Sequence, residues 1–391
     1  MRKDPCDGIG AHTHSIFPLR GVGGLLLLSF LLLTGCPVGR SAASPAPPDS
    51  DQPVLPHVGA AIIANSLGES LSRYDLSTTP ASLQINAGLT GQSPNELLIA
   101  GDRLLILNSL SNSVQIDDLA TLNVRAEYSC GPRTNPWNVA AQGNTLWITC
   151  WASQEVIAMD LTDGTILQRL PCPSDLPHDD GVLSRPYPQG IAIDASGERI
   201  AVTLANLNTD FAAGGPGTVW KLALSGETAT DAGLLILSAG RNAGDVTHTT
   251  VGGREAFVVA SAGDFQPGTG YLGNGSFHLI DAPTWRELAA IPVASAPVKI
   301  LAIGAHAYGA GAQAGDISQV DLGARTAGPV IQLPDSGTGL NYCSGLAAVD
   351  ATHLLALEFN SDKLYGIDLS TGEVSGGLTV GDGPDAIVLV P

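Results

Sequence analysis

The chain has few aromatic residues and few positive charges. Phe, Trp and Tyr make up 5% of its 391 residues, and 18 Lys and Arg face 37 Asp and Glu, for a net charge of −19 at pH 7. A body this acidic is repelled by nucleic-acid phosphates and by anionic lipid headgroups. We therefore expect no nucleic-acid partner, and cations or basic partners suit the protein better. The alternative is that the acidic surface serves solubility alone.

Several motifs of common catalysts are missing. The sequence holds no CxxCH haem motif, no P-loop, no GxSxG motif and no zinc-type spacing of Cys and His. No long segment carries apolar residues at helical spacing. Charged residues make up only 14% of the chain, which excludes a disordered protein. The absences favour an ordered all-β protein without a familiar catalytic motif.

One apolar run lies near the N-terminus and is too short to span a bilayer comfortably. The run GLLLLSFLLL (24–33) follows basic residues and ends in small ones, as in a processed signal peptide. The letters LTGC (33–36) resemble the lipobox of bacterial lipoproteins, in which the cysteine becomes the lipidated first residue. We expect residues 1–35 to be a signal peptide and Cys36 to be the membrane anchor. The alternative is an ordinary secretory signal with an incidental cysteine.

Residues 36–56 comprise Cys36 and a stretch rich in Pro, Ala and Ser. This composition predicts a semi-extended tether between the membrane and a folded domain. No second apolar run reaches spanning length, so lipid is the expected anchor. We expect a monomer in the cell envelope, on the outer membrane and facing the periplasm or the surface, with the folded domain at residues 57–391.

A short element, Asp-Leu-x-Thr, recurs along the domain. Seven copies are recognisable, separated by 43, 42, 63, 58, 40 and 47 residues. They begin at Asp75, Asp118, Asp160, Ala223, Asp281, Asp321 and Asp368. Recurrence at this period indicates a repeat fold.

Each copy follows two β-rich runs of five to seven residues, joined by a short turn containing Asn, Asp or Gly. A further short strand, usually introduced by Pro, precedes each pair. Four antiparallel strands per repeat make a propeller blade, with Asp-Leu-x-Thr as the turn between the third and fourth strands. The prediction is an all-β, seven-bladed β-propeller of four-stranded antiparallel blades.

The two ends of the domain complement each other. The last strand, PDAIVLV (384–390), lacks partners, and residues 60–86 supply three strands without a first one. Together they complete a seventh blade and close the ring. Over residues 57–391 the pattern resembles the YVTN-type seven-bladed propeller repeat. That resemblance implies the fold and leaves the function open.

Three long loops interrupt otherwise short connections on the face where the innermost strands begin, called the top face below. They span residues 172–188, 206–217 and 262–275, in blades 2 to 4. Long loops between tight repeats often carry binding sites, although such loops also grow without a ligand. The candidate ligand-binding residues are His178, Asp179, Asp180, Tyr187, Asp210, Phe211, Asp264, Phe265 and Tyr271. Acidic and aromatic groups on one rim suit a sugar, cationic or peptide ligand.

Polar residues near the start of the innermost strands should surround the central channel. Glu96, Asn138 and Asp245 supply oxygen ligands of the kind that calcium takes. Gluconolactonase-type propellers similarly hold a metal with channel-lining Glu, Asn and Asp, and the resemblance here is by residue type only. The prediction is a calcium-like divalent cation at these three residues, with His248 as a candidate base. Channel water that satisfies these groups is the alternative.

Four cysteines follow Cys36, at positions 130, 150, 172 and 343. Disulfides are expected outside the cytoplasm. Sequence alone leaves three connectivities open. We favour Cys130–Cys150, because the loop carrying Cys130 leads into the strand beside the one that ends at Cys150.

The leading functional hypothesis is a lipoprotein that binds a small molecule, glycan or protein through the top-face loops without catalysis. The alternative is a lactonase-like hydrolase that uses a channel cation. A quinoprotein-type oxidoreductase fits less well, because the five tryptophans are irregularly placed.

Overall fold

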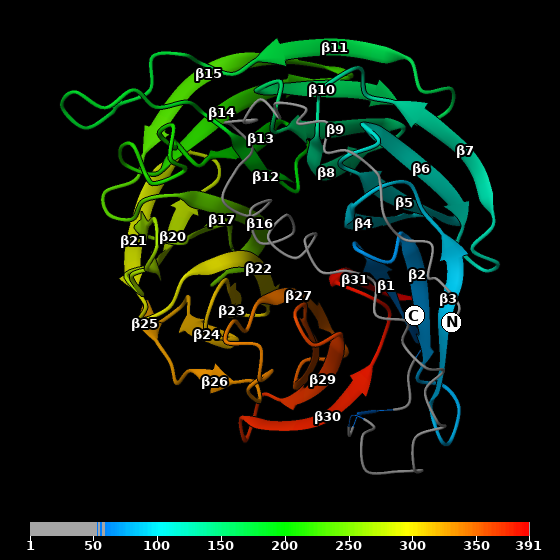
Figure 1. Ribbon diagram of the computed structural model, residues 1–391. Helices are drawn as coiled ribbons and strands as arrows, with labels where there is room; N and C mark the ends of the chain where they lie inside the picture. Colours follow the sequence, from blue (N-terminus) through cyan, green and yellow to red (C-terminus); the bar gives the residue numbers. More distant parts are fainter. Residues whose placement is uncertain (1–52, 54, 57–58, 391) are drawn as a thin grey trace, which may run out of the picture.

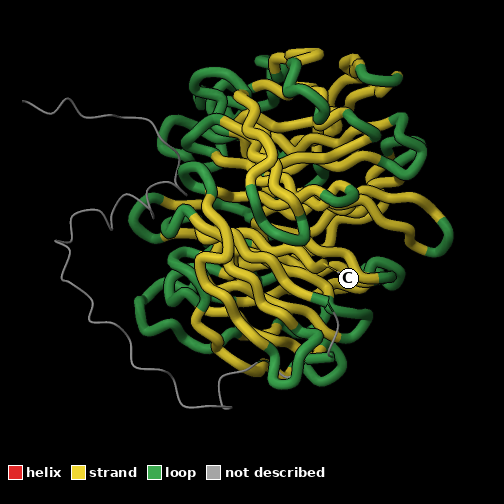
Figure 2. The backbone as a smooth tube through the Cα atoms, turned by 90° about the vertical axis from the view of Figure 1, so that its right-hand side faces the viewer, coloured by secondary structure: helices red, strands yellow, loops and turns green. Residues whose placement is uncertain are grey.

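The computed structural model describes residues 53, 55–56 and 59–390. Within them the chain forms strands and loops without a helix, arranged as a ring of seven antiparallel sheets (Figures 1 and 2). This part of the chain accordingly holds no helix long and apolar enough to cross a membrane. The predicted all-β, seven-bladed propeller is confirmed. The signal peptide, Cys36 and most of the tether lie outside the described residues.

Blades 1 to 3 each consist of four consecutive strands. Blade 1 comprises β4 (Pro94–Ala100), β5 (Arg103–Asn108), β6 (Ser113–Asp118) and β7 (Val124–Ser129). Blade 2 comprises β8 (Pro136–Gln142), β9 (Thr145–Cys150), β10 (Glu155–Asp160) and β11 (Ile166–Pro171). Blade 3 comprises β12 (Pro188–Ile193), β13 (Arg199–Leu204), β14 (Thr218–Ser225) and β15 (Thr228–Ile236).

Blades 4 and 5 depart slightly from this plan, and blade 6 returns to it. Blade 4 comprises β16 (Ala243–Val251), β17 (Arg254–Ser261), β20 (Ser276–Asp281) and β21 (Arg286–Pro292), with a small hairpin of β18 (Phe265–Gln266) and β19 (Gly270–Tyr271) in its top-face loop. Blade 5 comprises β22 (Pro297–Ile303), β23 (His306–Gly311), β24 (Asp316–Asp321) and a divided outer strand, β25 (Thr326–Ala327) and β26 (Ile331–Gln332). Blade 6 comprises β27 (Cys343–Ala348), β28 (His353–Glu358), β29 (Lys363–Asp368) and β30 (Glu373–Thr379).

The seventh blade joins the two ends of the domain. It consists of β31 (Pro384–Val390), β1 (Ala60–Asn65), β2 (Ser70–Asp75) and β3 (Ser82–Leu89), and β31 pairs antiparallel with β1 (Figure 1). The predicted closure is confirmed. The C-terminal strand is thereby the innermost strand of a blade whose other strands come from the start of the domain.

Neighbouring blades pack face to face, and their apolar side chains form the core. Between blades 1 and 2, for example, Leu107 and Ile116 lie in one buried cluster with Ile148 and Met159. The middle strands are covered on both faces, so β9 (TLWITC) is buried along its whole length. Outer strands face solvent on one side, and β11 alternates between half-buried and exposed residues. This division explains the mixture of continuous and alternating apolar runs in the sequence.

The recurring aspartates form the turn after the third strand of a blade, as the sequence indicated. Asp75, Asp160 and Asp368 end the third strands of their blades, and their carboxylates accept the backbone N–H two residues on at 2.9, 2.7 and 2.8 Å. Blade 3, with Ala223 at this position, turns through Gly226 at φ 62° instead. The Asp-Leu-x-Thr element is therefore a turn motif of the face opposite the top face.

Candidate functional site

A cavity of about 520 Å³ opens on the top face at the mouth of the central channel. Residues from all seven blades or their top-face loops line it. Its aromatic members are Trp137, Trp151, Phe211, Phe265, Tyr271, Tyr342 and Phe359. Leu110, Leu207, Val298 and Leu340 add further apolar surface. We refer to this cavity as the aromatic pocket.

The aromatic rings support one another around the rim. The ring of Trp151 lies 6.1 Å from Trp137 and 6.0 Å from Phe211, and Tyr187 packs behind it at 4.5 Å. On the other side Tyr342 lies 5.8 Å from Phe359. These separations are typical of aromatic pairs, which hold each other in fixed orientations. The pocket therefore has walls that are built before any ligand arrives.

The floor of the aromatic pocket depends on a bulge at the start of each innermost strand. In β4, Pro94 pairs with Asn108 and Glu96 with Leu107, which leaves Asn95 as an extra residue. The same irregularity occurs in β31, where Asp385 is the extra residue between Pro384 and Ala386. A bulge changes the direction of adjacent side chains, so consecutive residues can serve the pocket and the channel. Asn95 lines the pocket, Glu96 lines the channel, and Asp385 lines both.

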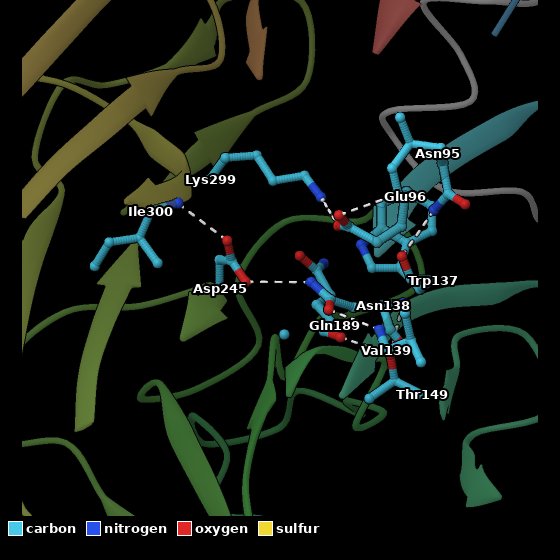
Figure 3. Close-up of polar contacts among 12 residues, drawn as sticks. Asn95, Glu96, Trp137, Asn138, Val139, Thr149, Gln189, Asp245, Lys299 and Ile300 are labelled. Carbon is cyan, nitrogen blue, oxygen red and sulfur yellow. Dashed lines mark hydrogen bonds and ion pairs between the residues drawn. The ribbon is translucent and has the colours of Figure 1, made fainter. Parts of the chain in front are cut away.

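Below the aromatic pocket, a smaller cavity of about 190 Å³ occupies the channel. Lys299 Nζ lies 2.6 Å from Glu96 Oε2, across the channel from blade 5 to blade 1 (Figure 3). Asn138 Nδ2 donates to Asp245 Oδ1 at 3.3 Å, and the Ile300 backbone N–H donates to Asp245 Oδ2 at 3.0 Å. The structure thus brings the polar residues predicted for the channel to one cavity, where two bonded sets, referred to together as the channel network, interact through their charges.

The network is more acidic than basic, and its pKa values reflect burial. Burial raises the pKa of Asp245 to about 6 and that of Asp385 to about 7, and the nearby Lys299 only partly opposes these shifts. Burial acts to lower the pKa of Lys299, but the charges of Glu96 and Asp245 outweigh it and raise that pKa. Near neutral pH Lys299 is therefore charged, while Asp385 is divided between its two protonation states.

The predicted cation ligands do not form an open metal site as they stand. Glu96 already holds the ammonium of Lys299, and Asp245 accepts hydrogen bonds at both oxygens. No group of three or more His, Cys, Asp or Glu side chains in the described part of the chain is placed to hold a metal. The calcium assignment to Glu96, Asn138 and Asp245 stays a prediction.

The loop residues predicted to bind a ligand separate into two groups. Phe211, Phe265 and Tyr271 line the aromatic pocket, and Tyr187 supports it from behind. The polar members, His178, Asp179, Asp180, Asp210 and Asp264, do not line it.

Two of these polar residues share a partner that the sequence pattern did not suggest. Arg241 lies 2.6 Å from Asp179 Oδ2 and 2.8 Å from Asp264 Oδ1, so it ties the loop 172–188 to the loop 262–275. His178 contacts the carbonyl of Leu176 at 3.1 Å. The ion pairs with Arg241 give Asp179 and Asp264 a role in holding the loops.

The candidate base and the four described cysteines line neither cavity. His248 packs edge-on against Phe257 and lies 3.9 Å from Glu255, and it lines neither cavity. The predicted Cys130–Cys150 disulfide is not formed. Both residues lie in one buried cluster as free thiols, and burial raises the pKa of Cys130 to about 12. Apolar packing, without a covalent link, holds them there.

No protein-family model and no curated protein matches the sequence. Solved structures do match the fold. A functionally unknown protein from Desulfotomaculum acetoxidans aligns with a TM-score of 0.63 at 15% identity, covering 85% of this chain and 99% of its own. A putative 6-phosphogluconolactonase from Bacteroides fragilis aligns with a TM-score of 0.63 at 12% identity, covering 89% and 100%. A streptogramin B lyase aligns with a TM-score of 0.53 at 15% identity, covering 75% and 86%. At such identities the likeness is one of fold alone, a β-propeller with distant lactonase-like and lyase neighbours.

Proposed function

We propose that this chain is a YVTN-type propeller lipoprotein of the cell envelope, monomeric and anchored through Cys36, which binds a small ligand in its aromatic pocket without catalysis. One observation carries the binding role, namely the aromatic-lined cavity that all seven blades enclose. Its volume of about 520 Å³ is in the range of small-molecule pockets, which are concave, mostly apolar and largely preformed. A concave cavity of this size fits a small molecule better than it fits the flat surface of a partner protein.

The lining of the aromatic pocket supports binding over hydrolysis. Among the described residues, the lining includes no His, Cys, Lys or Arg, and Asp385 is its only carboxylate. Burial raises the pKa of Tyr271 to about 12, so this phenol is a poor base at neutral pH. The lactonase-like alternative needs a cation at Glu96, where Lys299 already lies. The residues therefore favour recognition of a ligand without a reaction.

The binding role can be tested with a neutral aromatic probe, 2-naphthylmethanol, titrated calorimetrically into the full-length protein in non-ionic detergent. Wild type should bind the probe, and Trp151→Ala should weaken binding about tenfold or more, because it removes a wall of the pocket. Trp285→Ala is the matched control, since Trp285 stacks on Phe257 outside the pocket. Equal binding by both variants, or no binding by wild type, would refute the proposal.

The anchor is inferred from the apolar run at residues 24–33 and the LTGC letters that end it, and it needs its own test. Cys36→Ala should abolish lipidation, and the protein should move to the aqueous phase on detergent phase separation. Retention of the variant in membranes after a high-salt wash would show that Cys36 is not the anchor.

A further inference from the structure

Asp385 is the only charged residue among the described residues that line the aromatic pocket. It lies at the boundary between the pocket and the channel, since it lines both cavities. No described residue donates a hydrogen bond to its carboxylate. A half-buried carboxylate without such a donor, at the floor of an apolar cavity, is an incomplete polar site.

The charged groups beneath Asp385 do not neutralise it. Glu96, Asp245 and Asp385 bring three carboxylates to the channel, and Lys299 brings one ammonium. That ammonium is in contact with Glu96 at 2.6 Å. Fully ionised, this set carries a net negative charge, inside a chain whose own net charge is −19. The field at the floor of the pocket therefore favours a cation.

The amide side chains of the lining are mostly committed to the wall. Asn95 donates to the carbonyl of Trp137 at 2.9 Å. Gln313 accepts the backbone N–H of Tyr271 at 2.7 Å, and Asn242 contacts the Tyr271 hydroxyl at 3.5 Å. Of the five described amide side chains in the lining, those of Asn135 and Gln189 make no such hydrogen bond, and Asn135 Oδ1 is buried, so few amide groups remain to bind a sugar. What the pocket offers is aromatic faces and one carboxylate.

We propose that the ligand of the aromatic pocket is an organic cation, a quaternary or protonated amine on an apolar body, with its charge toward Asp385 and its body against the aromatic walls. This inference rests on the proposed binding function. Cations are attracted to the faces of Trp, Tyr and Phe, and the attraction is larger where water is excluded. An anion would instead meet the carboxylate of Asp385.

The affinity of the pocket for a cation should depend on pH. Lys299, Glu96 and Tyr342 interact with the charge of Asp385, and Asp245 lines the same channel cavity. Burial raises the pKa of Asp385 to about 7, so its negative charge is largely lost at pH 5.5 and largely present at pH 8. A quaternary amine does not titrate, so its affinity should rise about tenfold or more across this interval. The affinity of a neutral probe should stay nearly constant.

The test compares three naphthalene probes on the full-length protein in non-ionic detergent: 2-naphthylmethyl-trimethylammonium, neutral 2-naphthylmethanol and anionic 2-naphthalenesulfonate. At pH 8 the cation should bind about tenfold or more tighter than the neutral probe, and the sulfonate weakest. Asp385→Asn should bring the cation and neutral affinities to within about twofold of each other. Asp382→Asn, an exposed carboxylate three residues earlier, should keep the preference for the cation.

The outcomes separate this inference from the proposed function. If the neutral probe binds wild type and the cation binds no tighter, the inference is wrong while the binding function stands. If no probe binds, the binding function itself fails. Should Asp385→Asn not fold, the pH series on wild type decides, and a cation affinity that is constant from pH 5.5 to 8 would overturn the inference.

Discussion

Lys299 is the one positively charged side chain among the described residues that line the channel cavity, and replacing it with Met should destabilise the propeller. The substitution keeps most of the side-chain length and removes the ammonium that lies 2.6 Å from Glu96. Removing one partner of a buried ion pair typically costs about 3–5 kcal/mol. Here the side chains of Lys299 and Glu96 are 19% and 21% exposed, so channel water screens part of the loss. We expect the free energy of unfolding to fall by about 2–4 kcal/mol at pH 8.

The loss should depend on pH in a defined direction. The pKa values of Asp245 and Asp385 are raised to about 6 and about 7, so the folded state binds protons that the unfolded state releases. Stability from these two groups is therefore lost as the pH rises from about 4 through about 7. Lys299 limits that loss in wild type. The destabilisation by Lys299→Met should accordingly be smaller at pH 5, where both carboxyls are protonated, than at pH 8.

Urea unfolding of wild type and Lys299→Met at pH 5, 6.5 and 8 measures these differences. Lys363→Met is the matched control, because Lys363 contacts Thr379 on the exposed outer side of blade 6. It should change the free energy of unfolding by less than about 0.5 kcal/mol. Adding Glu96→Gln to Lys299→Met should restore part of the stability, since it removes an unpaired carboxylate. A Lys299→Met protein as stable as wild type at pH 8, or one destabilised more in acid, would refute the reasoning.

Three further predictions concern the ring and its channel. Deleting residues 384–391 removes β31 and should cost more than about 5 kcal/mol, since it uncovers apolar edges of two blades; a melting temperature within a few degrees of wild type would contradict this. Gly190→Ala would place a Cβ 2.6 Å from the Asp245 Cα and should lower the free energy of unfolding in urea by about 1–3 kcal/mol, whereas Gly244→Ala, with no close contact, should cost less. With Lys299 on Glu96, we expect calcium and chelator to leave the melting temperature of wild type unchanged. A rise with calcium that Glu96→Gln abolishes would instead establish the cation site, worth about 2.7 kcal/mol at a hundredfold excess over Kd.

The aromatic pocket was only partly accessible to sequence reasoning. Loop length drew attention to Phe211, Phe265 and Tyr271, all of which line it. Trp137 and Trp151 were noted only for their irregular spacing, yet they form one wall. The short loop at residues 333–342 gave no signal of length, although it delivers Leu340 and Tyr342. The aromatic side chains converge here because the top-face connections of all seven blades meet around one axis. This convergence is a property of the closed propeller.

Local patterns in the sequence determined the blade count, the closing strand and the aspartate turns, because each depends on residues close together in the chain or on a repeat that can be counted. The tertiary structure alone decided that Lys299 meets Glu96, 203 residues away, and that Asp385 reaches both cavities. Asp385 is the extra residue of the bulge in β31, so it lines the channel next to Ala386 and also reaches the aromatic pocket, which the sequence did not predict. Pairing across the channel depends on how far side chains reach once seven strands surround it, and no periodicity along the chain encodes that distance.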